Sequence, residues 1–365
     1  MRRWLCGVVA AAMMMATGCS AILNRDYSSV TPHSATPVSD GESNTIRVAS
    51  YQELVNALIY LIGRGAESGA IRFDGGESGE TEIQQMLDEA CLEVVQEDPL
   101  GAYAVEYIKY SVTPIVGSYE ADVQITYRRT REQVAAIVDA TGTAAIRSEL
   151  SEALSEFSTE VVLRISYFEE DSEYIRQLMR EAYLSNPASA LDFPDAQIAM
   201  YPETGQRRIV EVVLTYHQPR QTLESRRNSL LREVNRLLTQ VDDTTGEPVL
   251  TQLIRLLQQA CIYQEGSGST AYHALLEGEA DSQGMALALS LLCQRAQVPI
   301  SCAVADGQWN GVSHLWNVVQ TASGYRHVDL TQPGEVILRT DQEMAAAGYT
   351  WDRERVPVCA AEEET

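Results

Sequence analysis

The sequence predicts an α+β fold: two similar helix–strand–helix–strand–strand modules, followed by a third α+β domain. Three observations predict it. An internal repeat spans residues 50–240, and helical and strand periodicities follow one another in the same order in both copies. A break rich in Asp, Thr, Gly and Pro at residues 242–248 separates the repeat from the C-terminal part. A chain of 365 residues is long enough for this multidomain organisation.

Two matching pairs of segments carry the repeat. Residues 85–92 (QMLDEACL) align with 177–184 (QLMREAYL), and 123–127 (VQITY) align with 212–216 (VVLTY). A tyrosine and a following arginine recur in both copies, at Tyr127 and Arg131 and at Tyr216 and Arg220. We interpret these side chains as packing at strand ends and repeat junctions. A ligand site shared by both copies is the alternative.

The elements of the two copies follow from periodicity and turn residues. The first copy is expected to contain helix 51–62, strand 70–73, helix 80–96 and strands 103–113 and 119–128. The second is expected to contain helix 143–157, strand 160–168, helix 172–184 and strands 197–201 and 207–216. The predicted modules are therefore residues 49–140 and 141–241. Amphipathic helices 223–238 and 249–262 flank the break before the third domain.

The N-terminus is predicted to be a targeting segment. Arg2 and Arg3 precede an apolar run, residues 5–16, that is too short to span a bilayer. Residues 16–19 (ATGC) resemble the lipobox of bacterial lipoproteins, which implies a signal peptide at residues 1–18 and lipid attachment at Cys19. Residues 19–48 would form a flexible tether. We expect an extracytoplasmic protein that is lipid-anchored to the bacterial cell membrane; an ordinary secretory signal is the alternative.

Charge and cysteine content exclude several classes of partner. A net charge of −24 argues against binding nucleic acid and against electrostatic binding to anionic lipid. The cysteines beyond Cys19 show no metal-binding spacing, and no cofactor motif is present. They are Cys91, Cys261, Cys293, Cys302 and Cys359. Because five is odd, at least one thiol is free or intermolecular. Cys302 and Cys359 either pair or lie buried as small apolar residues.

Three polar residues in the C-terminal part have the order of a catalytic triad. Ser282 stands at a helix start rich in small residues, whereas His314 and Asp329 lie on successive strand-like runs. In this arrangement a base must reach the nucleophile, and an acid must fix the tautomer of the base. The sequence therefore predicts that these three side chains meet.

The surrounding motifs resemble the bacterial transglutaminase-like superfamily, which is related in fold to papain-like cysteine proteases. Residues 278–286 (GEADSQGMA), 314–317 (HLWN) and 327–331 (HVDLT) match its three motifs in order, and GYTWDRERVPVC at 348–359 extends the match. The resemblance implies a transglutaminase-like (papain-like) α+β domain at residues 249–359, with Ser282, His314 and Asp329 at the catalytic positions. The family's nucleophilic cysteine is replaced by Ser282 in this chain.

The replacement leads us to expect a pseudoenzyme. A helix N-terminus lowers the pKa of a thiol, but a serine hydroxyl gains little and requires the histidine as a general base. We therefore expect a non-catalytic protein that binds or scaffolds a cell-envelope peptide or protein. The first alternative is an acyl-transfer or peptide-hydrolysing enzyme using the three triad residues. The second is that the duplicated modules carry the function and the C-terminal domain is a platform.

Three further side chains are candidates for binding. Trp309 is expected on a loop that lines a groove, and Trp316 is expected to be a packing residue. His273 either contributes a polar group to the groove or lies at the surface. His314 itself is either structural, joining two strands through Asp329, or part of a binding or catalytic site.

Overall fold

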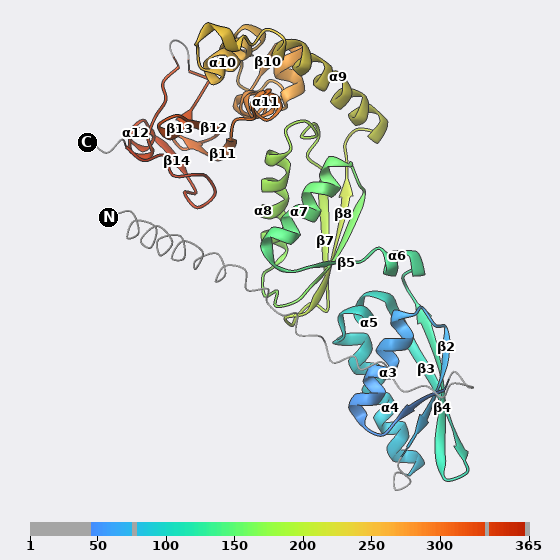
Figure 1. The fold of residues 1–365 in the computed structure, drawn as a ribbon. Helices are drawn as coiled ribbons and strands as arrows, with labels where there is room; N and C mark the ends of the chain where they lie inside the picture. The colour runs from blue at the N-terminus through green and yellow to red at the C-terminus, as the bar shows by residue number, and fades with distance from the viewer. Residues whose placement is uncertain (1–44, 75–78, 333–335, 362–365) are drawn as a thin grey trace, which may run out of the picture. The chain divides into compact units, whose positions relative to one another are not determined.

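The computed structural model describes residues 45–74, 79–332 and 336–361 (Figure 1). The expected signal peptide, the lipid-attachment residue Cys19 and most of the expected tether lie outside these residues. The described chain forms two compact units: unit 1 extends to Val95 and includes residues 105–128, and unit 2 holds residues 96–104 and those from 129 onward. Within the described residues, no helix has the length and apolar character needed to cross a membrane. The fold mixes helices and sheets, as the sequence predicts.

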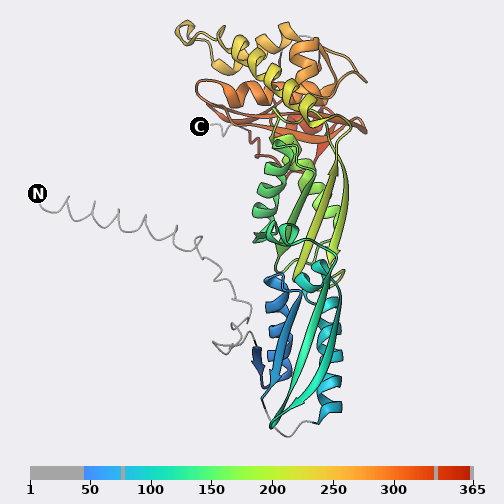
Figure 2. The same cartoon turned by 90° about the vertical axis from the view of Figure 1, so that its right-hand side faces the viewer.

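Unit 1 is a four-stranded sheet with two long helices on one face (Figures 1 and 2). The strand order is β1-β2-β4-β3; β1 runs parallel to β2 and the other pairs are antiparallel. Its elements are β1 (Thr45–Val48), α3 (Tyr51–Gly63), β2 (Ser68–Phe73), α4 (Glu80–Gln96), β3 (Val105–Ile115) and β4 (Ser118–Tyr127). Helix α3 begins where the Ser50 side chain accepts a hydrogen bond from the Glu53 amide, and Leu54 and Leu58 on its inner face are fully buried.

Unit 2 begins with a sheet of the same order and the same strand directions. Its order is β5-β6-β8-β7, with β5 parallel to β6 and the other pairs antiparallel. The elements are α5 (Pro99–Ala104), α6 (Arg131–Ala135), β5 (Val138–Ala140), α7 (Gly142–Ser155), β6 (Glu160–Ile165), α8 (Ser172–Ser185), β7 (Asp195–Tyr201) and β8 (Arg208–Thr215). Tyr127 is the last residue of β4 and Tyr216 directly follows β8, and Arg131 and Arg220 begin the helices that follow.

The structure corrects three sequence-based boundaries. Residues 45–48, placed in the tether, form β1, and residues 138–140, placed at the end of the first module, form β5 of the second sheet. Strands of three or four residues are too short to show an alternating pattern, so pairing with a neighbouring strand decides them. The strand expected from Tyr103 begins only at Val105, because the Asp98 carboxylate accepts hydrogen bonds from two amides and starts α5.

The C-terminal part of unit 2 surrounds one buried helix. This helix, α11 (Ser282–Arg295), is buried without interruption from Gly284 to Cys293. It packs against an antiparallel sheet of order β13-β12-β11-β14, called here the C-terminal sheet. Its strands are β11 (Cys302–Trp309), β12 (Val312–Thr321), β13 (Gly324–Val328) and β14 (Tyr349–Trp351). The remaining elements are α9 (Arg220–Leu238), η1 (Asp243–Thr245), α10 (Val249–Ala260), β9 (Ile262–Tyr263), η2 (His273–Glu277), β10 (Glu279–Ala280) and α12 (Asp341–Ala346).

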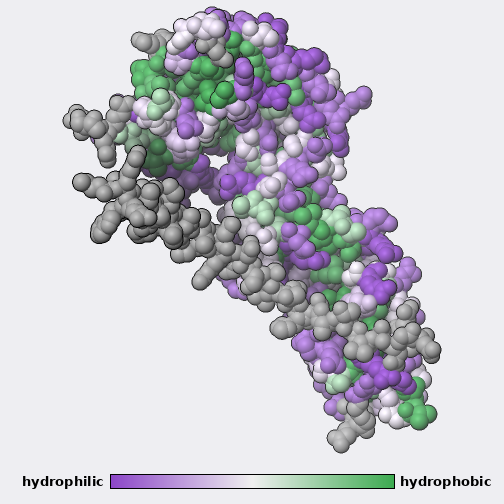
Figure 3. All heavy atoms as spheres, in the orientation of Figure 1, coloured by the Kyte–Doolittle hydropathy of each residue, from purple (hydrophilic) through white to green (hydrophobic). Residues whose placement is uncertain are grey.

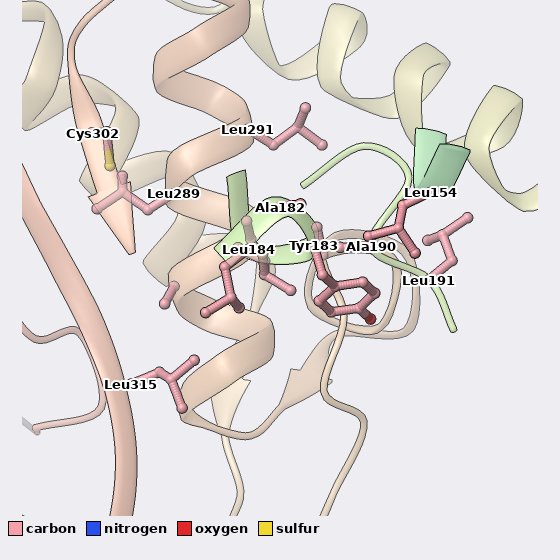
Figure 4. Packing of buried hydrophobic residues seen from close by; sticks show 14 of the residues in the cluster. Leu154, Ala182, Tyr183, Leu184, Ala190, Leu191, Leu289, Leu291, Cys302 and Leu315 are labelled. Atoms are coloured by element: carbon pink, nitrogen blue, oxygen red, sulfur yellow. The ribbon is translucent and has the colours of Figure 1, made fainter. Parts of the chain in front are cut away.

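One apolar core joins α8 to the C-terminal part of unit 2. Figure 4 shows Tyr183 and Leu184 of α8 in the same cluster as Leu289 of α11 and Leu315 of β12. A smaller cluster, which includes Trp316 and Tyr349, packs against other side chains of the C-terminal sheet. Burial of this apolar surface fixes α11 relative to β12 and so sets the position of the residues at its N-terminal end. At the surface, Figure 3 shows hydrophobic side chains over α10 and its neighbours. Ile262, which lies two residues after the end of α10, is 71% exposed.

Candidate functional site

Ser282 is the first residue of α11 and is half-buried. The preceding Asp281 caps the helix, and its carboxylate accepts a hydrogen bond from the Gly284 amide at 2.9 Å. Only glycine fits at position 284, because a Cβ there would lie 2.8 Å from the Gly268 carbonyl oxygen. Ser282 Oγ accepts a hydrogen bond of 3.3 Å from the Leu315 amide of β12. The serine is therefore held at the point where α11 meets the C-terminal sheet.

His314 and Asp329 form a buried pair, as the sequence predicts. His314 Nε2 lies 2.9 Å from Asp329 Oδ2, and the two side chains are 6% and 0% exposed. Tyr349 Oη donates to the same carboxylate oxygen at 2.5 Å. The other oxygen, Oδ1, accepts from the Thr331 amide at 2.9 Å and from the Thr331 hydroxyl at 2.8 Å. The carboxylate thus accepts four hydrogen bonds.

These contacts keep Asp329 ionised. Desolvation is the largest single influence and raises the pKa of Asp329, but the hydrogen bonds from His314, Tyr349 and Thr331 together lower it below its ordinary value. An ionised carboxylate only accepts hydrogen bonds, so His314 Nε2 carries the proton. A neutral His314 ring then has its lone pair on Nδ1, as a general base requires. Among the described residues, however, no hydrogen bond joins Ser282 to His314.

Aromatic rings surround the histidine. The centroids of Trp309, Tyr349 and Trp316 lie 5.8, 5.9 and 6.3 Å from that of His314. Trp309 is the last residue of β11 rather than part of a loop, and its indole N–H donates to the Ala347 carbonyl at 3.2 Å. The half-buried Trp309 ring lies beside the histidine, as a groove residue would. Trp316 is only 1% exposed and therefore belongs to the core rather than to a binding surface.

His273 belongs to η2 and not to the C-terminal sheet. Its Nδ1 lies 2.6 Å from Thr270 Oγ1, and its ring packs over Gly268, where a Cβ would lie 2.0 Å from the ring. The carbonyl of Gly268 in turn accepts a hydrogen bond from the Asp281 amide. The structure thus gives His273 a packing contact with the segment that supports the start of α11, and none of its hydrogen bonds reaches the triad residues.

A second histidine–carboxylate pair lies beside the first. The Trp316 indole N–H donates to His327 Nδ1 at 2.9 Å, and His327 Nε2 donates to Asp341 at 2.8 Å. Potential ligand atoms of His327, Asp341 and Cys359 lie within 4.8 Å of one another. These three residues do not form a metal site. The Trp316 indole can only donate, so His327 Nδ1 accepts, and the proton of the neutral His327 ring must be on Nε2. In this tautomer neither ring nitrogen has a free lone pair for a metal.

This pair predicts acid sensitivity. Burial, the largest influence, lowers the pKa of His327 despite the raising effect of Asp341. In the unfolded chain the ring takes up a proton near the ordinary histidine pKa of about 6.5, whereas the folded chain resists it to lower pH. The free energy of unfolding should therefore fall as the pH drops below about 6.5. Urea unfolding of the wild type and His327→Gln at pH values on both sides of this point checks it; equal pH dependence in both chains would contradict it.

The five cysteines of the described residues are free and buried. Cys302 lies against Cys293 of α11, and Cys359 lies close to Asp341. The pairing of Cys302 with Cys359 that the sequence left open is therefore not formed. The alternative, burial as small apolar residues, describes both thiols.

Some contacts of the site have no counterpart in the sequence motifs. Tyr349 and Thr331 complete the hydrogen bonds of Asp329, and the Leu315 amide binds Ser282. Arg180 of α8 donates to Gln283 at 2.7 Å and to Asp306 at 2.9 Å, which links the second module to the start of α11. Tyr349 stood within the matched GYTW segment, but the spacing gave no sign that its hydroxyl reaches Asp329.

Comparisons with known proteins leave the family open. No family model matches the chain, and no curated protein matches it. A solved structure described as a crystal structure of a TGase aligns with 62% of this chain and 67% of its own chain. The sequence identity is 10% and the TM-score is 0.26. A likeness with so low a TM-score carries no argument about fold or activity.

Proposed function

We propose that this chain is a cell-envelope protein that binds or scaffolds a peptide or protein and does not catalyse acyl transfer. The observation that carries the proposal is the environment of Ser282. Its Oγ accepts a hydrogen bond from the Leu315 amide, and among the described residues the serine makes no hydrogen bond with His314. A serine nucleophile requires a base within hydrogen-bond reach of its hydroxyl, at about 2.6–3.2 Å.

The proposal includes a transglutaminase-like assignment for residues 249–359. Its support is the three sequence motifs together with their placement: a helix that starts at Ser282, and a His–Asp pair in which His314 lies on β12 and Asp329 directly follows the neighbouring antiparallel strand β13. In such a scaffold a thiol would be activated by the helix N-terminus and the imidazole. A hydroxyl has too high a pKa to ionise in the ground state, so the same scaffold activates it far less. We infer that the cysteine-to-serine replacement silences the site.

One observation favours the second candidate, a serine-dependent acyl-transfer or amide-hydrolysing enzyme. The His314–Asp329 pair retains the hydrogen bond that orients a general base, and Nδ1 carries its lone pair. A rotation of the Ser282 side chain toward this nitrogen would assemble the triad. We rank this candidate second, because the same pair also serves as a structural link between β12 and the end of β13.

Intact-mass analysis after treatment with a fluorophosphonate tests the proposal. We expect no adduct on residues 20–365, because the Ser282 hydroxyl is not activated. The Ser282→Ala variant is the matched control and shows any background labelling of other serines. One stoichiometric adduct that disappears in the Ser282→Ala chain would favour the serine-dependent enzyme instead.

The proposal also concerns the origin of the two four-stranded sheets and the cellular location of the protein. The two four-stranded sheets share strand order and directions, which supports a duplication of one α+β module. For the cellular location we propose anchoring to the membrane through lipid attachment at Cys19, on the basis of the ATGC motif and the apolar run before it. The mass of the protein extracted from membranes, compared between the wild type and Cys19→Ala, tests it: the variant should lack lipid.

A further inference from the structure

The C-terminal sheet has an open edge along β11. Strand β14 pairs only with residues 307–309 of β11, so residues 302–306 have a neighbouring strand, β12, on one side alone. A cavity of about 480 Å³ lies along this stretch, and all five residues line it. This volume lies within the range of sites that bind ligands, about 300–1,000 Å³. Ser282, His314 and Asp329 are not among its lining residues.

The backbone groups of Val304 point into this cavity. In an antiparallel ladder, alternate residues direct both their N–H and C=O groups toward one neighbour. The Ser301 carbonyl accepts from Gln320 on the β12 side, whereas the Cys302 carbonyl turns away and accepts from the Ser290 hydroxyl at 3.1 Å. The backbone N–H and C=O groups of the even-numbered residues in this stretch therefore point away from β12. Within the described part of the chain, no backbone group forms a hydrogen bond with Val304 on this side, whereas the Asp306 carbonyl lies opposite the Asp352 amide that follows β14.

We propose that an extended, uncharged peptide segment of a partner protein binds here by adding a strand to β11, in continuation of β14. This inference rests on the proposed binding function and gives it a location away from the triad. An added strand would lie about 4.8 Å from β11 and satisfy the backbone groups of Val304. Main-chain hydrogen bonds would supply affinity, and the cavity walls would select side chains at alternate positions.

The residues that line the cavity indicate which peptide side chains would fit. Leu178 and Leu184 of α8 belong to the same core cluster as Cys302, whereas Trp351 packs against the cluster that contains Ala305. Because even and odd residues of a strand point to opposite faces, one wall lies on each face of the added strand. Small apolar side chains therefore suit both faces. The cavity walls also keep the sheet edge of another molecule from pairing with the open edge of β11.

The arginines that line the cavity are each paired with a carboxylate. Arg147 lies 3.2 Å from Glu181, Arg180 lies 2.9 Å from Asp306, and Arg355 lies 2.9 Å from Asp352. No guanidinium of this set is left without a carboxylate, so a strongly acidic peptide gains no new ion pair. An uncharged segment avoids the cost of breaking the existing pairs.

Titration calorimetry with a blocked peptide of alternating threonine and valine tests the proposal. We expect saturable binding to the full chain and none of the same peptide N-methylated at every amide, which cannot donate to β11. Val304→Pro removes the amide that faces the cavity while leaving the ladder to β12 intact, and it should weaken binding about tenfold. Val304→Thr keeps the amide and the shape, and it should bind like the wild type.

Each outcome separates this inference from the proposed function. Equal binding of the peptide and its N-methylated form, or equal affinity of Val304→Pro and Val304→Thr, would place the peptide elsewhere and overturn the edge site. Failure of the peptide to bind at millimolar concentration would also overturn it, because its main chain can make the hydrogen bonds that supply affinity and its side chains are small enough for both walls. Neither result bears on the activation of Ser282, which fluorophosphonate labelling measures independently.

Discussion

Replacing Asp329 with alanine is expected to lower the free energy of unfolding by about 3–5 kcal/mol, as removal of one partner from a buried charged pair does. The side chain is fully buried and accepts four hydrogen bonds, from His314, Tyr349 and Thr331. Alanine leaves these donors without a partner in a site that water does not reach. Urea unfolding at neutral pH, with and without the substitution, measures the loss.

The matched control is Asp352→Ala. Asp352 pairs with Arg355 at 2.9 Å, as Asp329 pairs with His314, but both side chains of the Asp352–Arg355 pair are well exposed. An exposed ion pair contributes about 0–1 kcal/mol, so this variant should unfold almost as the wild type does. If both aspartate variants lose the same small amount of stability, the buried pair does not hold β12 and the end of β13 together, and our account of Asp329 is wrong.

Replacing Trp316 with alanine should cost about 3–5 kcal/mol of stability, the usual loss for a large aromatic side chain removed from a core. Trp316 is the largest fully buried side chain of the described residues and contacts His314, His327 and Tyr349. Its removal also leaves His327 Nδ1 without a donor. Thermal and urea unfolding measure the effect.

Trp309→Ala provides the comparison within the same aromatic cluster. Trp309 is half-buried, and its ring stacks on Tyr349 with an interplanar angle of 21°. We expect a smaller loss of stability, because the removed side chain is partly solvated already. A larger loss for Trp309→Ala than for Trp316→Ala would contradict the assignment of Trp316 to the core and of Trp309 to its partly solvated margin.

Long periodic segments and the order of the triad residues could be predicted from the sequence. Helix α4 spans Glu80–Gln96 as expected, and His314 meets Asp329 as expected. The short strands β1 and β5 were missed, because tertiary pairing rather than local pattern creates them.

The contacts that decide the chemistry depend on packing across the fold. Ser282 binds the amide of Leu315, and Tyr349 reaches Asp329 from a strand that follows twenty residues later. The sequence identifies the residues with reactive side chains. The direction of the Ser282 hydroxyl, however, is set by how α11 packs against β12. For the same reason the sequence does not predict the open edge of β11, which exists because β14 ends at Trp351.

The rate of p-nitrophenyl acetate hydrolysis, measured for the wild type, Ser282→Ala and Ser282→Cys, tests the central claim most directly. The claim is that the scaffold retains an oriented base but lacks the thiol. We therefore predict equal rates for the wild type and Ser282→Ala, and a faster rate for Ser282→Cys, whose thiolate is favoured at the start of α11. A wild-type rate clearly above that of Ser282→Ala would show that the serine is activated and would contradict the account.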